Sequence, residues 1–115
     1  MIDRTKKLQA RFYETALGRK PVRDWLLDLR IEDRRMIGHD IATIEFGWPI
    51  GMPLCRPLGR GLWEARSDLN DRTIARIIFC TVKNEMVLLH GFIKKSQKAP
   101  LMDINLARKR HKEIE

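Results

Sequence analysis

Basic side chains lie on, and directly after, strand-like runs in the second half of the chain. Arg66 and Arg76 interrupt runs that are otherwise largely apolar, and the tract 94–98, Lys-Lys-Ser-Gln-Lys, follows the last run. Arginine binds phosphate oxygens with a planar fork and stays charged, while lysine supplies a compact point charge. These residue types in this spacing predict a surface that meets a polyanion.

The charge balance supports the same prediction. The chain has a net charge of +8 and a pI near 10.0. Residues 1–55 hold ten basic and eight acidic side chains, whereas residues 56–115 hold thirteen and seven. The excess therefore lies with the second half, which favours nucleic acid or an acidic protein as its partner. A generic soluble surface is the alternative.

Three strand-like runs must position these side chains. They span Leu62–Ser67, Thr73–Val82 and Met86–Ile93, and short polar segments separate them. This order predicts a continuous antiparallel meander. The middle run is apolar on both faces, as expected for a central covered strand, so a charge at Arg76 must face a cleft or find a partner.

The first half of the chain predicts packing support for this meander. Lys7–Tyr13 alternates as a half-buried strand, and helices are expected from Pro21 and over Glu32–Phe46. Trp25 falls on the apolar stripe of its helix, which favours a core position over base stacking, and Trp48 is expected to fold back onto the core.

The remaining segments are a connector and a closing helix. Residues 47–61 are rich in proline and glycine and predict a turn-rich connector. A last helix is expected to begin at Pro100, with Asp103 in its first turn and an apolar side that contains Ile104, Ala107 and Ile114.

Length and composition favour one soluble domain over residues 1–115, of the α+β class. No apolar run approaches a membrane span, so a cytoplasmic protein is expected. Cys55 and Cys80 have neither the spacing nor the companions of a zinc site, and Cys80 fits a buried strand position. We therefore expect no metal, no cofactor and no disulfide.

Three strings carry a resemblance to a known family. They are Gly61–Arg66 (GLWEAR), Ala75–Phe79 (ARIIF) and Leu88–Pro100 (LLHGFIKKSQKAP). Together they resemble the phage-derived Gp49-like group of HigB toxins, within the RelE/ParE toxin superfamily. The last string is the most specific of the three. The order of the expected elements resembles these toxins over nearly the whole chain.

The resemblance implies a RelE-like fold, in which a twisted antiparallel sheet carries two N-terminal helices and a C-terminal helix. It implies an endoribonuclease that cuts messenger RNA, commonly on the ribosome. It also implies a partner, a helix-turn-helix antitoxin of the HigA type encoded beside it.

Cleavage of RNA without a metal uses the 2′-OH as nucleophile on the adjacent phosphate. It needs a base, an acid for the leaving 5′ oxygen, and cations around the phosphorane. The resemblance implies that Arg76 binds the phosphate, with a salt bridge to Glu64 as the alternative. On this basis, Arg76→Ala is expected to abolish activity without disturbing the fold.

Arg66 shares a strand face with Glu64 and is expected to hold phosphate or to act on a proton. Glu64 could be a base or a partner of Arg66. Lys95 is the strongest candidate of the basic tract. Further phosphate contacts are expected from Lys94, Lys98, Arg60 and Arg108.

The proton donor is the open position in this scheme. His90 has a suitable intrinsic pKa, although a histidine between Leu89 and Gly91 is also typical of a hydrogen-bonded core residue. His111 is a candidate only if the last helix crosses the sheet, and Tyr13 lies on the first strand.

Two other functions fit the same fold class. A ParE-like toxin shares the fold and inhibits DNA gyrase by binding the protein. A non-catalytic RNA-binding domain, such as an inactive phage remnant, would also use the basic surface. Cuts in cellular transcripts distinguish the nuclease from both.

Overall fold

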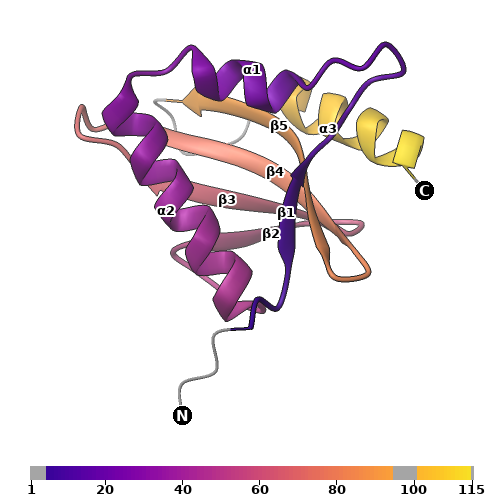
Figure 1. The fold of residues 1–115 in the computed structure, drawn as a ribbon, viewed down its shortest axis with the longest axis horizontal. Helices are drawn as coiled ribbons and strands as arrows, with labels where there is room; N and C mark the ends of the chain where they lie inside the picture. Colours follow the sequence, from indigo (N-terminus) through magenta and orange to yellow (C-terminus); the bar gives the residue numbers. More distant parts are fainter. Residues whose placement is uncertain (1–4, 95–100, 115) are drawn as a thin grey trace.

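The chain folds as a five-stranded sheet with helices on both faces (Figure 1). The computed structural model describes residues 5–94 and 101–114. The elements, in order, are β1 (Gln9–Phe12), α1 (Pro21–Leu27), α2 (Ile31–Gly47), β2 (Cys55–Gly59), β3 (Leu62–Asp68), β4 (Ile74–Val82), β5 (Glu85–Lys94) and α3 (Leu101–Ile114).

The expected meander is confirmed. The strand order is β1-β5-β4-β3-β2, and β3, β4 and β5 pair antiparallel with their sequence neighbours. The first strand differs from the expectation of a wholly antiparallel sheet, because β1 pairs parallel to β5, with Gln9 opposite Glu85. A parallel partner needs a long connection, which here is most of the chain.

Residues 47–61, which were expected to form a turn-rich connector, also include a strand that the sequence did not reveal. They contain β2, which pairs antiparallel with β3. Proline cannot donate to a strand ladder, but β2 is an edge strand, where Pro57 is tolerated. The two strands are joined by Arg60 and Gly61, with φ of 55° and 81°. Positive φ at both central residues is the signature of a type I′ hairpin turn.

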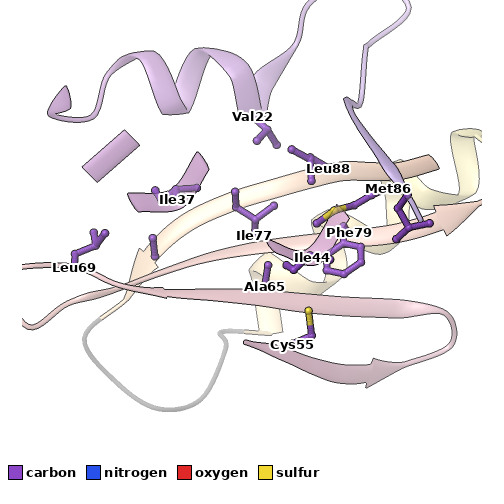
Figure 2. Packing of buried hydrophobic residues seen from close by; sticks show 12 residues of the cluster. Val22, Ile37, Ile44, Cys55, Ala65, Leu69, Ile77, Phe79, Met86 and Leu88 are labelled. Carbon is purple, nitrogen blue, oxygen red and sulfur yellow. The ribbon is translucent and has the colours of Figure 1, made fainter. Parts of the chain in front are cut away.

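The side chains of β4 alternate between two apolar cores, one on each face of the sheet. Ala75, Ile77 and Phe79 pack with Ile37 and Ile44 of α2, and Figure 2 shows this cluster between the helices and the sheet. The other face of β4 presents Ile78 and Cys80 to Ala107 of α3, with Ile104 and Ile114 packed beside them. A central strand covered on both faces explains why its sequence is apolar throughout.

The predicted roles of the tryptophans are confirmed. Trp48 folds back onto the sheet, edge-on to Trp63 at 5.0 Å and to Phe79 at 5.6 Å between ring centroids. Trp25 packs on the core from α1 and lies directly against the backbone of Gly91 on β5. A Cβ at Gly91 would stand 2.5 Å from Trp25 Cε3, so only glycine fits this contact.

We expect Gly91→Ala to lower the free energy of unfolding by about 1–3 kcal/mol, because the added methyl group forces Trp25 from its place. Gly38→Ala is the matched control, since a Cβ there meets nothing within 4 Å and the residue lies inside α2. That substitution should stabilise the protein by up to about 1 kcal/mol. Urea denaturation of both variants measures the difference, and equal midpoints would contradict the packing argument.

Helix α3 is fastened to the sheet by a polar contact. The Tyr13 hydroxyl donates a hydrogen bond to Glu113, Arg110 donates one of 2.7 Å to the Leu89 carbonyl, and the Arg110 guanidinium lies 5.4 Å from the Tyr13 ring centroid. The hydrogen bond to Glu113, burial and the negative charge of Glu113 raise the pKa of Tyr13, which Arg110 partly offsets. Tyr13 therefore joins the end of β1 to α3 and is placed for structure.

Tyr13→Phe should cost about 1 kcal/mol of stability, since it removes one hydrogen bond. The folded-state pKa of Tyr13 is raised, so this contribution is fully present below the unfolded pKa of about 10 and is lost as pH rises through the folded value. Thermal midpoints of wild type and variant should differ by a constant amount from pH 7 to 9 and converge at higher pH. A difference that grows above pH 10 would contradict this assignment.

Both cysteines are buried, and neither is part of a disulfide. Burial raises the pKa of the Cys55 thiol to about 11, and the thiol is therefore neutral at physiological pH. In the described part of the chain, no helix is both long and apolar enough to cross a membrane.

Candidate functional site

The strand register places the predicted site residues of β3, β4 and β5 on one face. Arg66 lies opposite Arg76, and Arg76 lies opposite Phe92. Two residues further along each strand, Glu64 lies opposite Ile78, and Ile78 lies opposite His90. Directly opposed residues of neighbouring strands share a face. Because Ile78 packs with Ala107, this is the face that α3 covers.

Glu64 is the centre of a buried charge cluster. Its Oε2 lies 3.5 Å from Arg76 Nη1, and its Oε1 lies 3.7 Å from Arg66 Nε. We call Glu64, Arg66 and Arg76 the Glu64 cluster. The side chains of Glu64 and Arg76 are 1% and 0% exposed, whereas that of Arg66 is 19% exposed. Glu64 and Arg76 are therefore fully buried, whereas Arg66 is partly exposed.

The N–O distances in the Glu64 cluster exceed those of normal hydrogen bonds, so these contacts are mainly electrostatic. Placing charges in the interior is costly, and the mutual attraction offsets that cost only while both partners remain. The structure therefore places Arg76 in the salt bridge that the sequence left as its alternative. With a fully covered side chain, Arg76 cannot touch an RNA phosphate in this arrangement.

Arg66 reaches the surface just beyond the last residue pair between β2 and β3. The pairing of β2 with β3 extends to Ala65, and the Arg66 N–H donates instead to the Leu54 carbonyl at 2.9 Å. Arg66 thereby lines a cavity of about 420 Å³ with Asp68, Met36, Asp40, Pro53 and Leu54. Of the two strand arginines, Arg66 is the one that an external phosphate can reach.

His90 is held by an acid from the first turn of α3. Its Nε2 lies 2.5 Å from Asp103 Oδ1, and the two side chains are 17% and 23% exposed. An ionised carboxylate only accepts, so Nε2 carries the hydrogen of this bond and Nδ1 holds the lone pair of the neutral ring. Phe92 stacks on the imidazole at 5.5 Å with an interplanar angle of 22°. The ring orientation is therefore fixed on two sides.

The remaining predicted residues divide into two groups. Lys95 and Lys98 lie outside the described residues, and of Lys94 only the backbone, at the end of β5, is described. Arg60 and Arg108 lie together, but at the opposite end of β3 from Arg66. They line a smaller cavity of about 190 Å³ with His111 and Lys112. Tyr13 packs with Ile78 and Ala107 on the face that α3 covers, and His111 lines the smaller cavity from α3.

Asp103 and Phe92 were not among the residues predicted for the site. The sequence assigned Asp103 to the dipole of the last helix, where acids are common. A signal was nevertheless present, because His90 and Asp103 lie on consecutive elements joined by a short segment. A histidine on a covered strand needs a polar partner, and Asp103 is the first acid that follows His90 in the sequence.

One family model matches the chain. Residues 24–112, more than half of the chain, match the family described as phage-derived protein Gp49-like. No match was found among curated proteins. The matched segment runs from within α1 through most of α3, and it includes the Glu64 cluster, His90 and Asp103. The α+β sheet and the three helices agree with a RelE-like fold, and the protein therefore belongs to the toxin-like, phage-derived Gp49-like family.

Proposed function

We propose that this protein is the toxin of a type II toxin–antitoxin pair and cleaves messenger RNA on the ribosome. The observation that carries the proposal is the shared face of β3, β4 and β5. On it, a partly exposed histidine oriented by a carboxylate lies two residues along the strand from the row that contains Arg66 and Arg76. A proton-transfer group beside fixed positive charge is what attack by a 2′-OH requires.

In this mechanism, His90 Nδ1 accepts the proton of the 2′-OH while Asp103 stabilises the imidazolium that forms. The 2′ oxygen attacks the adjacent phosphorus, the bond to the 5′ oxygen breaks, and that oxygen takes a proton from solvent or from the lysine tract. The products are a 2′,3′-cyclic phosphate and a 5′-OH end. Asp103 acts here as the orienting partner of the histidine, a role that carboxylates fill in other proton-transfer sites.

Within this proposal, Arg66 binds the phosphate and Arg76 positions it indirectly. Glu64 lies between the two guanidinium groups, at 3.7 Å from one and 3.5 Å from the other. The buried Arg76 holds Glu64, and Glu64 in turn holds Arg66 at the edge of the sheet. Lys94, Lys95 and Lys98 follow β5 and are proposed to contact the RNA backbone.

Mapping of cut sites tests the proposal. The purified protein, with ribosomes and a defined messenger RNA, should give new 5′-OH ends within codons and 2′,3′-cyclic phosphates upstream of them. A messenger with a 2′-deoxy nucleotide at the cut position should stay intact there, because its nucleophile is missing. Cleavage of the 2′-deoxy messenger at the same position would rule out this chemistry.

One observation favours a second function, a non-catalytic RNA-binding domain. Arg76, the residue expected to bind the scissile phosphate, is fully covered and paired with Glu64. In that case RNA is retained on the protein without any cuts, with or without ribosomes.

We further propose a helix-turn-helix antitoxin as partner. Co-expression of the adjacent reading frame should relieve growth arrest if the protein is a toxin.

A further inference from the structure

A basic cavity lies away from the Glu64 cluster, where the end of α3 meets the β2–β3 turn. Arg60 lines it from the turn, and Arg108, His111 and Lys112 line it from α3. We call these four residues the turn pocket. In the described residues no carboxylate lines it, although the chain has fifteen acidic side chains.

The two sides of the turn pocket are in close contact. A Cβ at Gly61 would lie 3.5 Å from His111 Cε1, so the helix packs directly against the turn. The rotation of α3 is fixed by the hydrogen bond from Tyr13 to Glu113 and by that from Arg110 to the Leu89 carbonyl. Residues 108, 111 and 112 share one face of a helix by their spacing. The pocket is therefore formed before any ligand arrives.

Bringing these charges together costs free energy. Arg108 and Lys112 are four residues apart on one helix, a spacing at which like charges repel. Arg60 occupies a left-handed position, with φ of 55°, that glycine, asparagine or aspartate fills at lower cost. The helix dipole favours cations in the last turn of α3, but it does not account for a cation on a separate element. An anion bound between the four side chains would offset the repulsion and explain why they lie together.

We propose that the turn pocket binds a phosphate group of the RNA backbone, as a second anchor outside the cleavage site. Arginine forks and a lysine arranged around a small cavity match the oxygen acceptors of phosphate. Gly61 and Arg66 are five residues apart on an extended strand, so the pocket lies roughly 16 Å along β3 from Arg66. One RNA strand can span that distance. That the phosphate belongs to RNA rests on the proposed function, whereas phosphate binding itself is argued from the pocket.

The test compares two double variants with the same loss of charge. Arg60→Asn with Arg108→Gln removes the pocket cations, and asparagine suits the positive φ of the turn. Lys83→Asn with Lys109→Gln is the control, because Lys83 has the same φ of 55° in the β4–β5 turn and Lys109 is an exposed residue of α3. Neither Lys83 nor Lys109 lines the turn pocket.

Binding of a fluorescently labelled single-stranded RNA is measured at several salt concentrations. The pocket variant should bind about tenfold more weakly, since charge-assisted contacts are lost. Its slope of log affinity against log salt should fall by about 0.7, one phosphate contact, while the control keeps the wild-type slope. Equal losses in both variants, or no loss in either, would overturn the proposal.

Two further measurements separate the possible outcomes. Wild-type protein titrated with the same RNA should show amide NMR shifts at residues 59–61 and 108–112, which needs no variant, and unshifted signals there would overturn the proposal. If the protein cleaves, the pocket variant should raise KM and leave kcat unchanged. Loss of cleavage with RNA binding at the pocket intact counts against the proposed function alone. Repeating the binding with ribosomes and with free RNA tells whether ribosomal or messenger RNA is bound.

Discussion

Replacing Arg76 by alanine should destabilise the protein by about 3–5 kcal/mol, because it leaves the carboxylate of Glu64 buried without its nearest cation. That loss is a large part of the 5–15 kcal/mol typical of a domain. The burial of Arg76 thus leads to a prediction opposite to the expectation from the sequence that this substitution spares the fold. Thermal and urea unfolding of the variant measure the effect.

Two controls isolate the cause of this loss. Glu64→Leu combined with Arg76→Met replaces the buried pair with apolar groups of similar size and should recover much of the stability. Arg23→Ala removes an exposed arginine whose distance to Asp24 is 3.9 Å and should change stability by less than about 0.5 kcal/mol. If Arg76→Ala is as stable as Arg23→Ala, the Glu64 cluster does not hold the fold.

The second large effect is expected on activity. His90→Gln should reduce the rate of RNA cleavage by about 10²–10⁴-fold, the usual contribution of a positioned proton-transfer group. The side chain is 17% exposed, and glutamine can still hydrogen-bond to Asp103. The unfolding midpoint should therefore change little. Single-turnover cleavage at saturating RNA measures the rate.

Asp103→Asn and His39→Gln complete this experiment. Asp103→Asn should lower the cleavage rate less than His90→Gln, because the imidazole loses its orientation but remains present. His39 is exposed on α2, and its replacement should leave the rate unchanged. Cleavage at the wild-type rate by His90→Gln would remove this residue from the mechanism.

Much of the fold follows from local patterns. Alternation and apolar runs gave the three strands of the meander nearly to their observed limits, and Pro21 marked the start of α1. Strand β2 escaped prediction because Pro57 and its flanking glycines look like turns, and only pairing with β3 makes them a strand. The parallel pairing of β1 with β5 joins residues 76 positions apart, which no local pattern reveals.

The candidate site was less predictable, because burial is a property of the assembled protein. Arg76 and Arg66 occupy equivalent positions in their strand patterns and are directly opposed in the sheet, yet one is fully covered and the other reaches the edge. Their difference arises from where β2 stops and from what packs over β4. The pairing of His90 with Asp103 likewise depends on the docking of α3.

The parallel pair β1–β5 has a consequence for biosynthesis. Gln9 emerges from the ribosome 76 residues before Glu85, its neighbour in the sheet. At a translation rate of about 5–20 residues per second, the first strand waits roughly 4–15 s for its template. During this delay α1 lacks the β5 surface against which it packs. The sheet can therefore be completed only after β5 has been synthesised.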